Sequence, residues 1–402
     1  MNTHRTDDTK KGAHKETPFM VLPLFFLTAV FFLNFTIRII LAPLMPTLLT
    51  DMDVSPDQAG SFFLTSAIGY FISLTLSGFV SARLKHRKTI LLAAVAAGLT
   101  IIGAGMSQNL ATFRMGIFAV GLATGLYFPS AIALLTATID RKNWGKALGI
   151  HEIAPSFSFL FAPLICEGLL LWVSWRSILM ILGVASIGFG VSFYMFSKTK
   201  DFRGEAPMLG SLTSLMSTSS FWVMLALFSL GITGTLGIYT MLPLYLVKTH
   251  GMIQAEANTL ITLSRVFTLP MSMIIGWITD RLGVKRTLSG ILCLTGMATL
   301  SIGILTGLPM KAVICCQSLL AVCFFPPAFA ALSQLYTEET RNVAISFTTP
   351  SAFLVGAGVS PNIIGVLGDN GYFESGFIIF GALIFIGAVL PFFLGLLREK
   401  DT

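Results

Sequence analysis

Long apolar runs follow one another along nearly the whole chain with only short polar connections between them, and this succession constrains the fold more than any other feature. Each run is long enough to cross a bilayer as a helix, which takes about 20 residues. Only 11% of the residues are charged, whereas soluble domains carry about 25%. We therefore expect an all-α membrane protein with twelve transmembrane helices, placed at 19–48, 57–80, 89–107, 111–138, 146–172, 176–197, 219–247, 255–279, 287–307, 311–334, 342–366 and 373–397.

Lysine and arginine gather in every second connection. Twenty of the 26 lie in segments that would share a side with the N-terminus, and four lie at the other ends of the runs: Arg114, Arg176, Lys248 and Lys311. Because basic residues are retained on the cytoplasmic side, both termini are expected in the cytoplasm and the protein in the inner (plasma) membrane. This pattern accounts for the net charge of +7 and argues against a nucleic-acid partner.

The longest polar connection divides the runs into two sets of six. We expect a cytoplasmic tail at 1–18, bundles at 19–197 and 219–397, a cytoplasmic linker at 198–218 and a short tail at 398–402. A related motif closes the second and the eighth run, 198 residues apart, with these residues: Gly78, Arg83 and Arg87, then Gly276, Asp280, Arg281, Gly283, Lys285 and Arg286. Such spacing indicates a parallel repeat of two six-helix halves.

The second copy of this motif resembles the G-x-x-x-D-R-x-G-[RK]-[RK] loop of the major facilitator superfamily. In the first copy, Ala82 stands where that family has Asp, and Lys85 where it has Gly. Trp175 and Arg176 resemble the start of the family's sixth span. The family's fourth-span signature is resembled by Arg114, Gly121, Gly125 and Pro129. The resemblance covers about residues 19–397 and implies two pseudo-symmetric six-helix bundles that transport by alternating access.

The charges of the loop motif suit a contact between helix ends on the cytoplasmic face. Asp280 can accept hydrogen bonds there, and Arg281, Lys285 and Arg286 can pair with acids or helix C-termini. Gly283 allows a tight turn. Alternatively, these charges only set the topology. Because Ala82 replaces the acid, the contact at the first copy is expected to be looser.

No pattern of enzyme chemistry occurs in the sequence. There is no P-loop, no metal-ligand cluster and no nucleotide-binding domain that a primary pump would need, so we expect no metal, no cofactor and transport driven by gradients or exchange. The five cysteines all lie in apolar runs, where packing is their expected role: Cys166, Cys293, Cys315, Cys316 and Cys323.

Two arginines lie deep within apolar runs, one in each half. Arg38 is in the first run, with Asn34 four residues earlier on the same helix face, and Arg265 is in the eighth. A charge near the bilayer centre costs about 2.5–3.5 kcal/mol on insertion scales, so both are expected to face a shared cavity and bind an anion. The alternative is that each pairs with a helix-end carbonyl or a local acid. Tyr127 could direct its hydroxyl at the substrate or merely pack, as could Tyr70 and Tyr239, which likewise lie within runs.

Acids are scarce in the apolar runs. Glu152 follows His151 about two turns into the fifth run, where the pair could be a proton site, a charge partner for an arginine, an inner gate or simply an interfacial pair. Glu167 lies near the outer end of the same run and is expected to reach the interface.

These features predict a monomeric secondary transporter of a small organic anion, carboxylate- or sulfonate-like, by symport with a proton or cation or by anion exchange. Arginine in the first span resembles organic-anion:cation symporters of the superfamily, and arginine in the eighth resembles its carboxylate and nitrate carriers. A proton-coupled drug or metabolite exporter is the alternative, but it would be expected to carry an acid in the first or fourth run. A non-transporting sensor or assembly protein would have no need of two cavity arginines.

Overall fold

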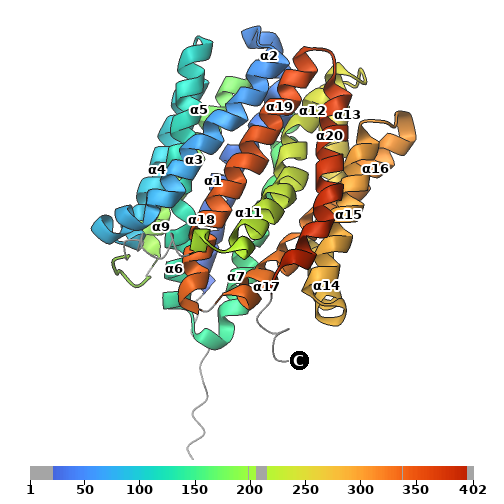
Figure 1. Cartoon of the computed structure of the whole chain (residues 1–402). Helices are drawn as coiled ribbons and strands as arrows, with labels where there is room; N and C mark the ends of the chain where they lie inside the picture. The colour runs from blue at the N-terminus through green and yellow to red at the C-terminus, as the bar shows by residue number, and fades with distance from the viewer. Residues whose placement is uncertain (1–20, 198, 205–214, 337, 396–402) are drawn as a thin grey trace, which may run out of the picture.

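The computed structural model describes residues 21–197, 199–204, 215–336 and 338–395, and this part of the chain is helical throughout, without a strand (Figure 1). The elements up to the linker are α1 (Val21–Ile39), α2 (Leu41–Met52), α3 (Pro56–Leu84), α4 (His86–Gly105), α5 (Leu110–Gly125), α6 (Tyr127–Thr138), η1 (Arg141–Asn143), α7 (Trp144–His151), α8 (Ile153–Leu170) and α9 (Trp175–Phe196).

The elements after the linker are α11 (Ser219–Ile232), η2 (Thr233–Gly237), α12 (Ile238–Lys248), α13 (Gln254–Arg265), α14 (Thr268–Leu282), α15 (Val284–Ile302), α16 (Gly307–Val322), α17 (Phe325–Leu335), α18 (Glu338–Leu354), η3 (Val355–Val359), α19 (Ser360–Asp369), α20 (Phe373–Ile386) and η4 (Gly387–Phe393). Grouped into spans, they give twelve membrane crossings in two sets of six.

Ten spans within the described residues are long and apolar enough to cross a membrane by themselves. The other two are adjacent: the eighth span, interrupted between α13 and α14, and the ninth, α15, which begins with basic residues. Several boundaries differ from the expected ones by a few residues. The fifth span, for example, begins at Arg141 rather than at residue 146.

Prolines explain where the spans are interrupted. A proline removes one backbone hydrogen bond and its ring clashes with the carbonyl four residues earlier. Helix α1 ends four residues before Pro43, α5 four residues before Pro129, and α7 four residues before Pro155. Two π-helical turns, η2 and η3, likewise precede Pro243 and Pro361. The interruptions therefore follow from the sequence.

The two halves repeat down to the backbone of the loop motif. Lys85 joins α3 to α4 with φ 69° and ψ 153°, and Gly283, 198 residues later, joins α14 to α15 with φ 81° and ψ 156°. Only glycine adopts this conformation easily, and other residues are strained by about 1–3 kcal/mol. The turn is therefore kept in both copies, although only the second copy retains the glycine.

Each half is held together by close helix packing. In the first half α3 lies against α5 and α4 against α9, and in the second α15 lies against α20. A Cβ atom added at Gly121 would come within 2.1 Å of the Ser66 carbonyl oxygen, so α3 and α5 touch backbone to backbone. Small residues allow such approach where no hydrophobic effect drives helices together.

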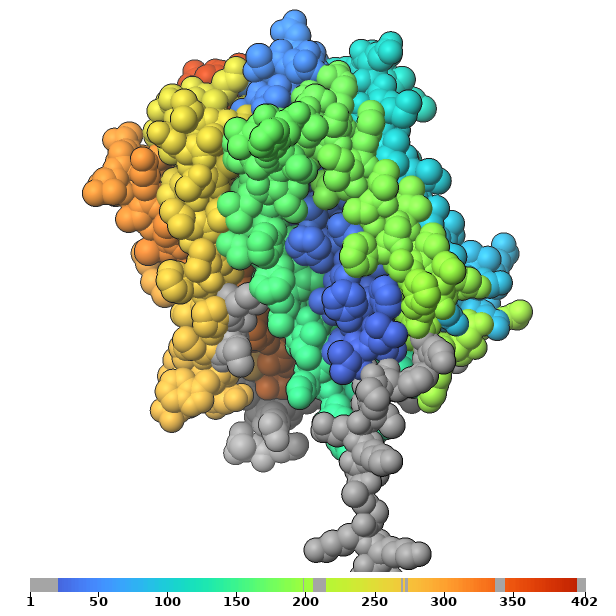
Figure 2. Space-filling view, turned by 180° about the vertical axis from the view of Figure 1, so that it is seen from behind, coloured from blue at the N-terminus to red at the C-terminus, as the bar shows by residue number. Residues whose placement is uncertain are grey.

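The two halves meet most closely at one end of the bundle. We call the end with the α3–α4 and α14–α15 connections the motif end, and the end with the α2–α3 and α12–α13 connections the far end. Across the halves, α2 packs on α12, α3 on α18 and α19, and α8 on α13. A Cβ at Gly60 of α3 would lie 2.7 Å from the Pro361 carbonyl oxygen of α19. Figure 2 shows green and yellow segments of the two halves touching in its upper part and diverging lower down.

The start of the linker lies against the first half at the motif end. The Lys85 ammonium is 2.9 Å from an Asp201 carboxylate oxygen, the His86 amide donates to the Phe202 carbonyl at 3.1 Å, and the Gly204 amide donates to the Ser81 carbonyl at 3.1 Å. The first copy of the motif, which lacks its own acid, thus contacts an acid supplied by the linker.

Candidate functional site

Arg265 is a buried cation with free hydrogen-bonding capacity. It is the last residue of α13, just before the interruption of the eighth span, and only 3% of its surface is exposed. One terminal nitrogen donates to the Thr235 carbonyl of η2 at 3.4 Å. The Nε and the other terminal nitrogen have no partner among the described residues. A guanidinium keeps its charge and presents donors in a planar fork, so two donors remain for a ligand.

Two aromatic rings face this guanidinium from other helices. Its central carbon lies 4.5 Å from the ring centre of Phe159 on α8 and 5.1 Å from that of Tyr239 on α12. The Tyr239 hydroxyl is buried and also lacks a partner within the described part of the chain. Buried polar atoms in native proteins are almost always hydrogen-bonded. These three orphan donors on two neighbouring residues therefore indicate a polar ligand.

Arg38 lies over aromatic rings of both halves. It is near the end of α1, with its central carbon 3.7 Å from the ring centre of Tyr70 on α3, 5.0 Å from that of Phe353 on α18 and 5.4 Å from that of Phe35. Its side chain is partly exposed. Cation–π contacts hold a guanidinium in place without occupying its in-plane N–H groups.

An aromatic cluster connects the two arginines. The Phe35 ring, beneath Arg38, is 5.3 Å from the Phe159 ring, which lies beneath Arg265. No acid pairs with either arginine among the described residues, whereas Lys85 pairs with Asp201 and Arg176 with Asp51. Two arginines without an acidic partner, both packed on the same aromatic cluster, form a site suited to an anion.

Asn34 and Tyr127, both expected at the substrate, are engaged elsewhere. The Asn34 amide is 3% exposed and donates to the Thr124 carbonyl of α5 at 3.2 Å. The Tyr127 hydroxyl is fully buried and donates to the Leu27 carbonyl of α1 at 2.6 Å. Both side chains join the first span to the fourth, so we leave them out of the site.

His151 and Glu152 lie where Pro155 interrupts the fifth span. The His151 ring is fully buried, stacks 4.6 Å from the Phe31 ring and shares a hydrogen bond of 3.0 Å with the Tyr127 hydroxyl. Its Nδ1 is 3.3 Å from a Glu152 carboxylate oxygen, and the Glu152 side chain is 48% exposed. No contact in the described structure joins this pair to Arg38 or Arg265.

The loop-motif residues lie at the motif end. Arg87 donates to the Tyr194 carbonyl of α9 and lies over its ring, and Arg281 stacks 3.8 Å from the Trp277 ring centre. The remaining residues are Gly78 within α3, Gly276 within α14, Gly283 at the turn, exposed Arg83, Asp280 and Arg286, and partly buried Lys285. The expected cytoplasmic contact by Asp280 stays a prediction.

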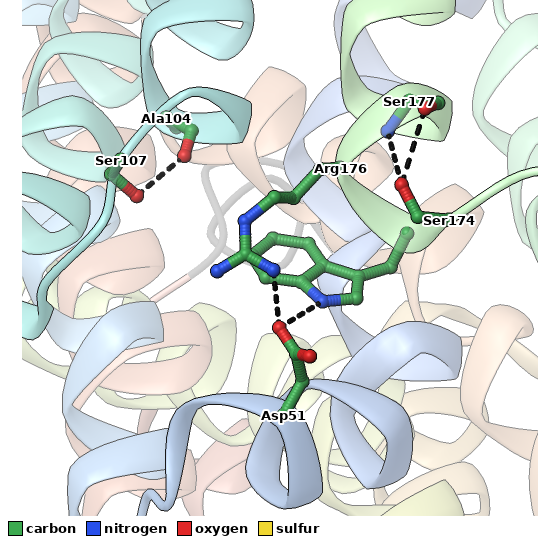
Figure 3. A network of polar contacts seen from close by, with 7 residues as sticks. Asp51, Ala104, Ser107, Ser174, Arg176 and Ser177 are labelled. Atoms are coloured by element: carbon green, nitrogen blue, oxygen red, sulfur yellow. Dashed lines mark hydrogen bonds and ion pairs between the residues drawn. The ribbon is translucent and has the colours of Figure 1, made fainter.

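The start of the sixth span is fixed by a polar network at the far end (Figure 3). The Trp175 indole donates to an Asp51 carboxylate oxygen at 3.0 Å, and Arg176 pairs with the same oxygen. Ser174 caps α9 by accepting from the Ser177 amide at 3.3 Å. This network ties the end of α2 to α9 within the first half and contributes no group to the arginine site.

Comparison with known proteins settles the family. The sequence profile of the Major Facilitator Superfamily matches residues 24–256 and 248–402. The chain belongs to this superfamily. It is a transporter and a multi-pass membrane protein, not an enzyme, and the resemblance seen in its loop motif is confirmed.

Curated relatives are distant but cover much of the chain. A probable sulfoacetate transporter of Cupriavidus necator, SauU, is 23% identical over 93% of this chain and 93% of its own length. A probable L-galactonate transporter of Escherichia coli is 20% identical over 65% of this chain and 61% of its own length. An uncharacterised transporter of Bacillus subtilis, YuxJ, is 21% identical over 85% of this chain and 88% of its own length.

Solved structures confirm the fold. A D-xylose–proton symporter superposes with a TM-score of 0.77 at 14% identity, covering 94% of this chain and 98% of that one. An inward-facing bacterial homologue of the human lysosomal transporter Spinster also gives a TM-score of 0.77 at 14% identity, covering 94% and 97%. The all-α architecture of two six-helix bundles is therefore confirmed.

Proposed function

We propose that this superfamily transporter carries a small organic anion with a carboxylate or sulfonate group, bound between Arg38 and Arg265. The observation that carries the proposal is Arg265, a buried guanidinium with two free donors beside the free Tyr239 hydroxyl. Carboxylate and sulfonate oxygens match a guanidinium fork. The relatives named for sulfoacetate and L-galactonate, both organic anions, support this substrate class.

Transport is proposed to run by alternating access, as proton or cation symport or as anion exchange. The excess of basic residues around the motif end supports a cytoplasmic location of that end and of both termini. Contact between the halves at the far end supports access to the proposed site from the cytoplasmic side. A monomer suffices, because both arginines come from one chain.

Counterflow in proteoliposomes tests the proposal. Vesicles preloaded with one candidate anion are offered the same anion in labelled form, with sulfoacetate, L-galactonate, acetate and sulfate compared in parallel and uncharged D-xylose as a negative control. We expect counterflow of at least one organic anion in the wild type and its loss in Arg38→Ala and in Arg265→Ala. Lys311→Ala, which removes an exposed cation, is the matched control and should retain activity.

Equal expression and monodispersity of the variants are required for the comparison. Wild-type counterflow in both arginine variants would refute the anion site. Transport of D-xylose in place of every anion would refute the substrate class.

A further inference from the structure

A carboxylate links the two halves at the far end. Glu167 of α8 accepts from the Asn258 amide of α13 at 2.6 Å and from the Gln254 amide at 3.3 Å. Gln254 in turn accepts from the Thr47 hydroxyl of α2 at 2.7 Å. We call Thr47, Glu167, Gln254 and Asn258 the far-end cluster. Asn258 also donates to the Pro43 carbonyl of α2 at 3.1 Å, so the cluster joins the two halves through several side-chain hydrogen bonds.

The geometry requires Glu167 to act as an acceptor. The Asn258 amide nitrogen lies between the Pro43 carbonyl oxygen and the Glu167 carboxylate, and both of these accept. Because a carbonyl oxygen can only accept, the contact with Pro43 requires the Nδ2 of the buried Asn258 to face these two groups. Hydrogen bonds to an ionised carboxylate are roughly twice as strong as neutral ones. The cluster therefore joins the halves most tightly when Glu167 is ionised.

No cation neutralises this carboxylate. The charged groups on the helices packed around α8 near its far end and along the arginine site are Arg38, Asp51, Arg176, Glu256 and Arg265. Asp51 and Arg176 pair with each other. The titratable group that contacts Glu167 is the Cys166 thiol, at 4.0 Å. The described contacts of this carboxylate are thus neutral amides and a thiol, so its protonation would act directly on the contact between the halves.

The cluster is also connected to the arginine site. Asn258 and Arg265 lie two turns apart on α13, both buried. Glu167 and Phe159 lie on α8, and Phe159 lies beneath Arg265. Motion of α13 relative to α8 therefore alters both the anion site and the donors to Glu167.

We propose that Glu167 is the proton-binding site that couples transport to a proton gradient. Protonated Glu167 weakens the far-end cluster and favours opening at the far end, where the proton is loaded. Closure brings back the two amide donors and favours the carboxylate, so that the proton leaves to water on the side of the motif end once the far end is sealed. Linkage requires that, if protonation of Glu167 favours opening of the far end, opening of the far end favours protonation of Glu167 by the same factor. This mechanism deepens the proposed function and rests on it, because the anion is the substrate whose transport the proton would drive.

Native Cys166 reports on the far end without any engineered probe. Its side chain is fully buried behind the cluster, so N-ethylmaleimide reaches it when the halves separate. Labelling at Cys166 is measured by mass spectrometry at pH 8 and pH 5.5 and expressed as the ratio of variant to wild type, which cancels the intrinsic pH dependence of the thiol. Glu152→Gln is the comparison variant, because Glu152 is the other candidate proton site on the same span and its side chain contacts His151 of the same half.

At pH 8 we expect Glu167→Gln to be labelled about tenfold faster than the wild type, the order expected for loss of one charge-assisted hydrogen bond. At pH 5.5 the ratio should be smaller than at pH 8, because the proposal has protonation remove the same contact from the wild type. Cys166 of Asn258→Ala should be labelled faster than that of the wild type at pH 8, because this variant also removes a hydrogen bond to Glu167 between the halves. Glu152→Gln should match the wild type at both values. Equal labelling of Glu167→Gln and wild type at pH 8 would overturn the proposal.

Transport separates this proposal from the proposed function. Glu167→Gln should lose uptake driven by a pH gradient and keep counterflow, whereas Glu152→Gln should keep both. Wild-type counterflow without gradient-driven uptake would overturn the coupling role of Glu167 and leave anion exchange. Absence of anion counterflow in the wild type would refute the proposed function, while the Cys166 labelling would still decide whether Glu167 controls the far end.

Discussion

Replacing Arg265 by methionine should stabilise the substrate-free protein while abolishing transport. Methionine has nearly the same length and no polar hydrogen, so it removes two buried donors that have no partner among the described residues. Each unsatisfied donor costs about 1–3 kcal/mol. The losses are the hydrogen bond to Thr235 at 3.4 Å and the aromatic contacts, together about 2 kcal/mol.

The balance is a gain in unfolding free energy of about 0–4 kcal/mol, with a central value of about 2 kcal/mol. Substrate binding should weaken far more, because two charge-assisted hydrogen bonds are worth about 3–6 kcal/mol, or roughly 100-fold to 10,000-fold in affinity. Arg265→Lys keeps the charge but loses the fork, and should fall between these limits.

The assay is thermal unfolding of the purified protein with and without the anion found by counterflow. We expect the midpoint of Arg265→Met to rise by a few degrees without substrate and to become insensitive to substrate, while Lys311→Met behaves as wild type. A lower midpoint combined with a substrate-dependent shift that survives would show that Arg265 is a structural residue, and the reasoning from its free donors would be wrong.

Three further predictions concern packing and the loop motif. Gly60→Ala should slow counterflow with little loss of thermal stability, because a Cβ there meets the other half at 2.7 Å. Gly121→Ala, whose Cβ would lie 2.1 Å from a carbonyl oxygen within the same half, should instead lower the unfolding free energy by about 1–3 kcal/mol. Lys85→Gly should leave the unfolding midpoint unchanged or raise it, because the relief of about 1–3 kcal/mol of backbone strain exceeds the loss of a surface ion pair worth less than about 1 kcal/mol. Asp201→Asn, which removes only the ion pair, should speed proteolysis within residues 199–204. Asn34→Ala should lower the unfolding midpoint and leave substrate affinity unchanged.

Periodicity and charge predicted the fold because the bilayer leaves few alternatives. Apolar runs of sufficient length must become helices, and prolines fix where those helices break. The same reasoning singled out Arg38 and Arg265, since a buried charge is costly wherever it lies. Their shared aromatic cluster could not be foreseen, because Phe35 and Phe159 belong to different spans and helix spacing says nothing of contacts between them.

The polar residues show more clearly what a single sequence leaves open. Asn34 and Arg38 are four residues apart, yet their side chains contact different helices, α5 and α3. Glu152 lies deeper in its apolar run than Glu167, but the interruption near Pro155 leaves Glu152 exposed, while Glu167 reaches the other half through residues about 90 positions away. The depth of a charged residue along an apolar run indicates its free-energy cost in the bilayer. Which charged side chains contact one another depends on how helices distant in sequence pack.

The interrupted eighth span has a consequence for how the protein is made. Its two helices have 12 and 15 residues, with Arg265 at the junction, and an arginine at this depth opposes release from the translocon into lipid by about 2.5 kcal/mol or more. The ninth span follows directly and begins with Lys285 and Arg286. The interruption with Arg265 in the eighth span and the basic start of the ninth disfavour partitioning of each segment alone, so we expect the two to enter the bilayer together as a hairpin, guided by the seventh and tenth spans. The arginine proposed to bind the anion is thus expected to oppose insertion during biogenesis, and a nascent chain ending after the eighth span should integrate less efficiently than one that also contains the ninth.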